Sequence, residues 1–238
     1  MRLNNYTLLS LIFLALSLMM KSIPLLDLEM LKFFNSLMFS EKFFSYFTEI
    51  GNGLICLAIT IPLLSLISHK TKLNNVKVQT MVFVIFGVGL IVKGFKELTS
   101  MFFVRPGYYE FDDIVYLEPV YSYSSFPSGH AATMFSLFFV WISLSFRNTK
   151  IKYANFLINM ILLFALLVSL SRVVVAAHWL SDVLGSIAIA FLALNAINEK
   201  VFRNILYESK VAKFSSFFLI GIAWAYIILT GTIYEYEF

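Results

Sequence analysis

The sequence has little charge and almost no cysteine. Of its 238 residues, 13% are charged and 60% are hydrophobic, whereas an ordinary soluble domain is about a quarter charged. A globule of this size keeps much of its surface in water and cannot bury so much apolar area, so a single soluble domain is excluded. The single Cys56 excludes an internal disulfide and a cysteine-rich metal site.

The aromatic content and a mean hydropathy of +0.83 indicate an integral membrane protein. The chain has 26 Phe and 12 Tyr, side chains that suit lipid and its interface. A disordered chain would instead be polar and poor in aromatics. The net charge of the chain is +4. Membrane topology explains the placement of the basic residues in loops, so no nucleic-acid partner is expected.

Seven apolar stretches approach the roughly 20 residues that a helix needs to cross a bilayer. They are 6–24, 51–67, 78–99, 131–146, 153–176, 179–197 and 214–234. Some are short or interrupted, so the sequence predicts six to seven transmembrane helices. Residues 25–47 mix apolar and charged side chains, which predicts an amphipathic helix on the bilayer surface. We expect an all-α membrane protein with one domain, residues 1–238, and a catalytic core of four helices over about 78–197.

Basic residues gather in alternate loops, where Glu199 and Glu208 are the accompanying acids. Those basic residues are Arg2, Lys70, Lys72, Lys77, Arg147, Lys150, Lys152, Lys200, Arg203, Lys210 and Lys213. The positive-inside rule places these loops and the N-terminus in the cytoplasm, and the C-terminus outside. We therefore expect a multi-pass membrane protein.

Ionisable residues at membrane depth are costly and are therefore candidates for function. Outside the cytoplasmic loops they are Lys93, Lys96, Arg105, His130, Arg172, His178 and Asp182. All fall at the outer ends of the third to sixth stretches. Arginine binds phosphate bidentately and lysine adds a point charge, so this group predicts an anion site suited to phosphate.

The tetrapeptide Pro127-Ser128-Gly129-His130 begins the fourth stretch. Proline and glycine interrupt the chain there, so free N–H groups and the positive dipole end of the helix face outward and can bind phosphate oxygens. The alternative is an ordinary helix cap, with Ser128 as N-cap and His130 at the interface.

A second motif joins the fifth and sixth stretches. It consists of Ser171-Arg172, five residues, His178, three residues and Asp182. His178 and Asp182 stand at i and i+4, one turn apart on one helix face. The carboxylate can accept the Nδ1 proton and leave Nε2 free as a nucleophile. The alternative is a pair that only stabilises a helix end.

Lys96 and Arg105-Pro106 lie at the end of the third stretch. The alternative to a phosphate site here is a pair of basic side chains that snorkel to the interface. Lys93 can pair with Glu97 at i+4. Lys96 would then be the lysine that remains available to bind an anion.

Together and in this order, the three elements resemble the signature of the type 2 phosphatidic acid phosphatase superfamily, which includes bacterial lipid phosphatases and vanadium haloperoxidases. The family pattern is a lysine shortly before Arg-Pro, then Pro-Ser-Gly-His, then Ser-Arg, five residues, His, three residues and Asp. The second and third elements match throughout. The first departs, because the spacing from Lys96 to Arg105 is longer than is usual in the family.

The resemblance implies a role for each motif residue. His178 would attack phosphorus and form a phosphohistidine, Asp182 would hold His178, and His130 would protonate the leaving alkoxide and then activate water. The phosphate oxygens would be held by Lys96, Arg105, Ser128, Gly129, Ser171 and Arg172. Cationic side chains would neutralise the phosphate, so no metal and no cofactor is expected.

The resemblance therefore implies a phosphatase of the bacterial inner (cytoplasmic) membrane that acts on a membrane lipid phosphate at the periplasmic face. Lipid A, phosphatidylglycerol phosphate and undecaprenyl pyrophosphate all fit. One alternative is a lipid A phosphotransferase that uses the same phosphohistidine. Another is an anion transporter, whose charges would line a conduit across both faces. The acidic cluster Glu110, Asp112 and Asp113 is expected to be a solvated loop tip, and the sequence does not indicate an oligomeric state.

Overall fold

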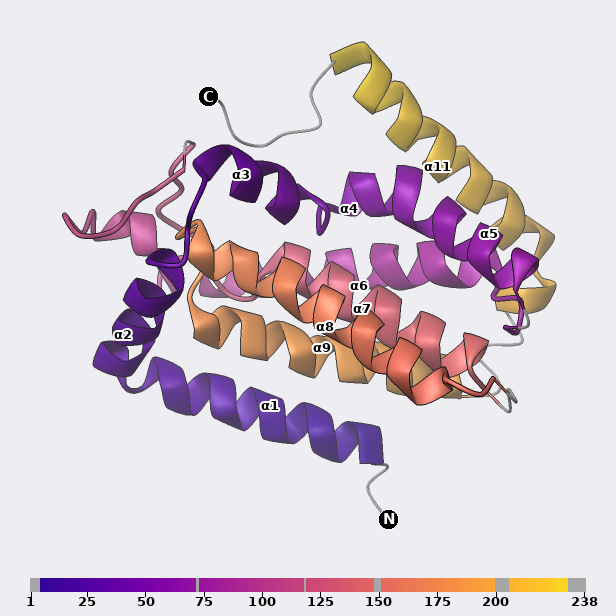
Figure 1. The fold of residues 1–238 in the computed structure, drawn as a ribbon, viewed down its shortest axis with the longest axis horizontal. Coiled ribbons are helices and arrows are strands. Elements are labelled where there is room, and N and C mark those ends of the chain that lie inside the picture. The colour runs from indigo at the N-terminus through magenta and orange to yellow at the C-terminus, as the bar shows by residue number, and fades with distance from the viewer. Residues whose placement is uncertain (1–4, 72, 118, 148–150, 200–205, 231–238) are drawn as a thin grey trace.

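The computed structural model describes residues 5–71, 73–117, 119–147, 151–199 and 206–230, and within them every regular element is helical (Figure 1). The elements are α1 (Asn5–Lys21), α2 (Pro24–Asn35), α3 (Glu41–Glu49), α4 (Gly53–Ile55), η1 (Cys56–Thr60), α5 (Ile61–Lys70), α6 (Val78–Thr99), η2 (Pro106–Tyr108), α7 (Gly129–Ser145), α8 (Ala154–Val174), α9 (Leu180–Asn198) and α11 (Lys210–Thr230). The all-α prediction is confirmed. Helices cover the described part of each of the seven predicted stretches.

Among the helices that the described residues form, five are long and apolar enough to cross a membrane individually. They are α6, α8, α9, α11 and the continuous helix Gly53–Lys70. The pair α1 and α2 passes the same test only together and is bent by 97°, which gives up to six. At 17 residues, α7 is shorter than the others. The structure and the prediction of six to seven therefore agree at six.

The centre of the bundle is α7, because this helix is apolar on all sides. Twelve of its 17 residues are buried, and it packs against α6, α8 and α9. A helix that is hydrophobic all round is typical of such a buried position. By contrast, α11 lies at the edge, where it contacts α6 and η1 and buries few side chains (Figure 1). The predicted core of four helices is thus α6 to α9.

Helix α1 is joined to α9 by small hydroxyl residues. Ser10 Oγ donates to the carbonyl of Ala188 at 2.9 Å, and Ser17 Oγ donates to the carbonyl of Ser181 at 2.6 Å. In lipid, small side chains let two helices approach closely and bond across their interface. The first helix is therefore held along α9, whose first turn carries Asp182.

The segment 25–47 forms two helices instead of the predicted single surface helix. Pro24 lacks an N–H donor and begins α2 after the sharp bend. Ser40 then caps α3 by accepting a hydrogen bond from the N–H of Phe43 at 3.2 Å. The polar side chains of Asp27 and Asn35 are buried against the bundle, since α2 packs on α8 and α9. The amphipathic pattern therefore faces protein rather than only a bilayer.

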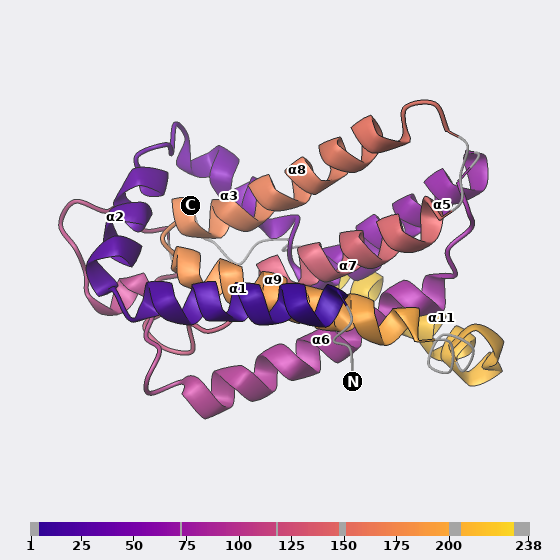
Figure 2. The same ribbon diagram turned by 90° about the horizontal axis from the view of Figure 1, so that it is seen from below.

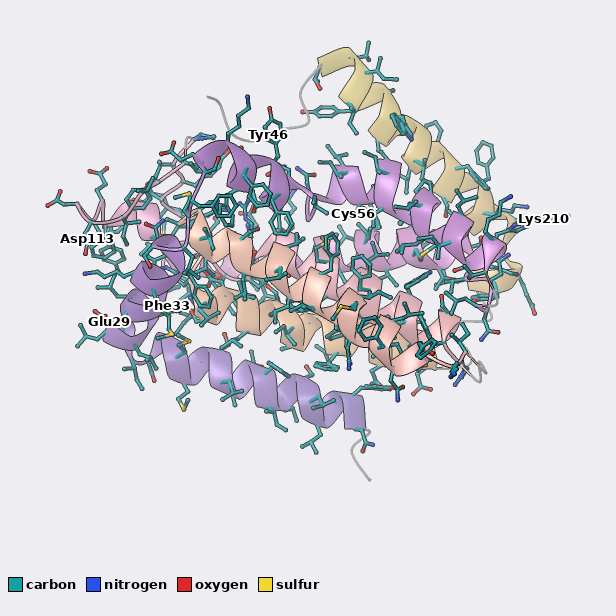
Figure 3. All side chains as sticks on the ribbon, in the orientation of Figure 1. Glu29, Phe33, Tyr46, Cys56, Asp113 and Lys210 are labelled. Carbon is teal, nitrogen blue, oxygen red and sulfur yellow. The ribbon has the colours of Figure 1, made fainter. Side chains whose placement is uncertain are left out.

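The two ends of the bundle differ in charge. Figure 3 places Glu29 and Asp113 at one end and Lys210 at the other. At the basic end, Asn74 Nδ2 donates to the carbonyl of Arg147 at 2.5 Å, which ties two basic loops together. At the acidic end lie α2, α3, the end of α8 and the start of α9 (Figure 2). The three sequence motifs meet at this acidic end of the bundle.

Candidate active site

The second and third motifs are in direct contact. The N–H of Ser128 donates to the carbonyl of Asp182 at 3.5 Å. Ser186, one turn further along α9, donates its hydroxyl to the carbonyl of Ser128 at 2.9 Å. Gly185 allows this approach, because a methyl group added there would lie 2.2 Å from the ring of Phe126. The start of α7 is thus held against the first turns of α9.

His178 and Asp182 form a buried pair. Nδ1 of His178 lies 3.3 Å from Oδ2 of Asp182, and the two residues are 1% and 0% exposed. The same Oδ2 accepts a hydrogen bond from the N–H of Trp179 at 3.1 Å and another from Ser125 Oγ. A carboxylate held in this way places the imidazole proton on Nδ1. Nε2 is then the ring nitrogen with a free electron pair.

A tight turn between α8 and α9 brings Arg172 and His178 together. The N–H groups of Ala177 and His178 both donate to the carbonyl of Arg172, at 3.0 and 3.1 Å. Ala176 has φ 54°, in the left-handed region where glycine is favoured at helix ends. The five residues between Arg172 and His178 therefore form the turn that reverses the chain at the end of α8.

Arg172 and His130 share one carboxylate, that of Glu49. Oε1 of Glu49 lies 3.3 Å from Nε2 of His130 and 3.7 Å from Nη1 of Arg172. Arg172 also donates to Thr48 Oγ1 at 3.2 Å. Burial raises the pKa of Glu49, but hydrogen bonds from His130 and Asn52 and the charge of Arg172 outweigh it and hold this pKa below its ordinary value. The carboxylate is charged at neutral pH.

Arg105 and Lys96 act on the site through their charge. Arg105 is 8% exposed, and its Nε donates to the carbonyl of Tyr123 at 3.0 Å. Burial, then the charges of Arg105 and Lys96, hold the pKa of His178 well below its ordinary value, against the opposing effect of Asp182. His178 is thus neutral at neutral pH. The role of Lys96 and Arg105 in phosphate binding stays a prediction.

The remaining motif residues are placed at helix ends. Ser128 caps α7 by accepting a hydrogen bond from the N–H of Ala131 at 3.5 Å, and Gly129 is the first residue of that helix. Ser171 donates its hydroxyl to the carbonyl of Val168 at 2.6 Å, so its proton is engaged within α8. The phosphate-binding roles of these residues stay predictions.

The sequence analysis missed Lys21 and Glu49. The Lys21 ammonium lies 2.7 Å from Oδ1 of Asp182, and Glu49 contacts His130 and Arg172. Both are ionisable residues at apolar stretches: Lys21 lies near the end of the first, residues 6–24, and Glu49 lies just before the second, which begins at Gly51. Because ionisable residues at membrane depth are costly, the sequence alone could have identified Lys21 and Glu49 as candidates.

The acidic loop cluster lies apart from these contacts. Asp113 pairs with Lys32 of α2 at 2.8 Å, and both side chains are exposed. In the part of the chain that the structure describes, no group of three His, Cys, Asp or Glu side chains could hold a metal ion.

Comparison with known proteins identifies the family. The model of the PAP2 superfamily matches residues 77–206, more than half of the chain and all three motifs. The chain belongs to the PAP2 superfamily. This membership supports a phosphatase, a phosphoric ester hydrolase, at the level of the superfamily.

The fold of this PAP2 protein is similar to that of a bacterial protein. The crystal structure of Aquifex aeolicus LpxE matches it with a TM-score of 0.55 and 23% sequence identity. The match covers 71% of this chain and 93% of that one, and at this identity it shows the fold alone. No curated protein sequence matches the chain significantly. The PAP2 match begins at residue 77, so α1 to α5 precede it.

Proposed function

We propose that this protein hydrolyses a phosphate ester or anhydride on a membrane lipid headgroup through a phosphohistidine at His178. The observation that carries the proposal is the buried His178–Asp182 pair, whose histidine is held neutral by burial and by the charges of Arg105 and Lys96. A neutral imidazole with a free Nε2 is a nucleophile, and the surrounding cations suit phosphate.

An apolar groove supports a lipid as the substrate. It has a volume of about 850 Å³ and is lined by side chains of α5, α7 and α8, among them Leu63, Trp141 and Phe164. Its lining begins at Ile50, the residue after Glu49, and extends to Ile151 beyond the basic end of α7. Acyl chains fit such a surface, with the phosphate beyond its Ile50 end, next to Glu49.

The first chemical step forms the phosphohistidine. Nε2 of His178 attacks phosphorus, the bond from phosphorus to the lipid oxygen breaks, and His130 gives its proton to that leaving oxygen. Asp182 keeps the Nδ1 proton of His178 in place. Arg172, with Arg105, stabilises the negative charge on the non-bridging oxygens.

The second step releases inorganic phosphate. His130 takes a proton from water, the water oxygen attacks phosphorus, and the phosphorus–nitrogen bond breaks. His178 returns to its neutral form, and His130 is again protonated. Every proton removed in one step is returned in the other, so the two histidines complete a cycle without a further reactant.

The location proposed for this site is the periplasmic face of the inner membrane. The described parts of the basic loops, at the ends of α5 and α7 and the start of α11, lie at the opposite end of the bundle from the turn between α8 and α9 (Figure 1). The substrates proposed are lipid A, phosphatidylglycerol phosphate and undecaprenyl pyrophosphate, which share a phosphate at the bilayer surface. The bilayer itself is the other partner.

The test is phosphate release by detergent-purified protein, with EDTA present, from each of these lipids and from phosphatidic acid. We expect release from at least one lipid and a loss of about 1,000-fold or more in His178→Ala. His69→Ala is the matched control, because His69 is exposed near the opposite end of the bundle. Label that moves to a second lipid, without free phosphate, would identify a phosphotransferase. Folded protein that does neither would contradict the proposal.

A further inference from the structure

Glu49 places a second carboxylate in the site, beside the other histidine. It is 1% exposed, and its Oε1 lies 3.3 Å from Nε2 of His130 and 3.7 Å from Nη1 of Arg172. A buried carboxylate in an anion site is unexpected, because it repels the phosphate that the cations attract. The residue lies on α3, before the part of the chain that the PAP2 model matches.

The surrounding structure holds this carboxylate against His130. Asn52 Nδ2 donates to the other oxygen, Oε2, at 2.8 Å, and Asn52 Oδ1 caps α4 through the N–H of Leu54 at 2.9 Å. Gly51 lets the turn between α3 and α4 lie directly on the start of α7, because a methyl group added there would lie 3.0 Å from Cβ of His130. The position of Glu49 therefore follows from the packing of α3, α4 and α7.

We propose that Glu49 is a positioning residue with two effects: it keeps His130 protonated as the acid for the leaving group, and it occupies Arg172 until phosphate arrives. This inference rests on the proposed function. A neighbouring carboxylate favours the imidazolium form, which is the form that can protonate a leaving oxygen. The same negative charge competes with phosphate for the guanidinium of Arg172.

The elements around the start of α7 carry other titratable groups. They are Arg172 on α8, His178 and Asp182 at the start of α9, Lys96 on α6, and Arg105 in the loop before η2. The cations among them disfavour a second positive charge on His130. Glu49 contributes a negative charge at contact distance, while Asp182 is already engaged by His178 and Lys21.

The test uses Glu49→Gln, which keeps the size and hydrogen-bonding capacity of the side chain and removes its charge. We expect the high-pH limb of kcat/KM to move to lower pH, with a loss of about tenfold on the alkaline side and little loss on the acid side. Binding of inorganic phosphate, measured by calorimetry on the acid side of this limb, should tighten about fivefold because Arg172 no longer shares a carboxylate.

Two further variants sharpen this test. Glu41→Gln removes an exposed acid from the first turn of the same helix and should change neither quantity. Asn52→Ser keeps a cap for α4 but loses the donor to Glu49, so it should shift the limb in the same direction by a smaller amount. Thermal unfolding in detergent shows whether each variant is folded.

The outcomes separate this inference from the proposed function. Active wild-type protein with an unchanged limb and unchanged phosphate affinity in Glu49→Gln would overturn the inference alone. An equal loss of activity at every pH, without tighter phosphate binding, would indicate a structural role and would also overturn it. If wild-type protein releases no phosphate from any lipid, the proposed function fails, and the affinity for inorganic phosphate decides whether Glu49 competes for Arg172.

Discussion

Lys21 and Asp182 form a buried ion pair that joins the first helix to the start of α9. Nζ of Lys21 lies 2.7 Å from Oδ1 of Asp182, and the side chains are 10% and 0% exposed. The ammonium also lies 4.8 Å from the ring centroid of Phe103. Lys21 therefore balances the carboxylate that holds His178.

The variant Lys21→Met should shift the pH dependence of the reaction. Without the ammonium, the charge of Asp182 acts fully on His178 and favours its protonated, non-nucleophilic form. We expect the low-pH limb of kcat/KM to move to higher pH, with about a tenfold loss on the acid side. Lys21→Arg keeps the charge and should retain the wild-type limb. A uniform loss at all pH values would show that Lys21 serves folding only.

The low-pH limb of the wild-type profile should lie below about pH 6.5, the ordinary pKa of histidine. Burial and the charges of Arg105 and Lys96 lower the pKa of His178, so the imidazole stays neutral until the pH falls to that lower value. Activity is therefore present above the lowered pKa and is lost as the pH falls through it. Measuring kcat/KM from about pH 4 to 9 checks this, and a limb at or above the ordinary value would contradict it.

Lys96→Ala should weaken transition-state binding despite the long spacing from Arg105. Its charge acts on His178, and phosphoryl transfer depends on cations near the non-bridging oxygens. We expect kcat/KM to fall by about tenfold or more. Lys93→Ala is the control, because Lys93 is exposed one turn earlier on α6. Unchanged kcat and KM in Lys96→Ala would remove this lysine from the site.

Asp27→Ala should lower stability. Asp27 Oδ1 accepts a hydrogen bond from the N–H of Ser181 at 3.2 Å, and its other oxygen accepts one from Ser181 Oγ. Removing the carboxylate leaves both donors buried without that partner, which costs about 1–3 kcal/mol. Thermal unfolding in detergent should show a lower Tm. Glu29→Ala, an exposed acid on the same helix, should leave Tm nearly unchanged.

The sequence predicted the helical spans and the His178–Asp182 pair because both depend on local spacing. An apolar stretch of about 20 residues forms a helix in lipid because its backbone groups must bond within the segment. His178 and Asp182 are four positions apart, with three residues between them, and this short separation brings the histidine just before α9 next to the carboxylate in its first turn. The left-handed residue Ala176 was not predictable in the same way, since alanine carries no turn signal.

The sequence by itself determined the membrane class, the helix ends to within a few residues, and the motif residues at one end of the bundle. Tertiary structure alone decided which charges meet. Nothing local in α1 pairs Lys21 with Asp182, and nothing local in α3 turns Glu49 toward His130. Amphipathic periodicity tells which side of a helix is buried, but the partner depends on how helices distant in the chain pack. In this protein, that packing gives each of the two motif histidines, His130 and His178, its own carboxylate.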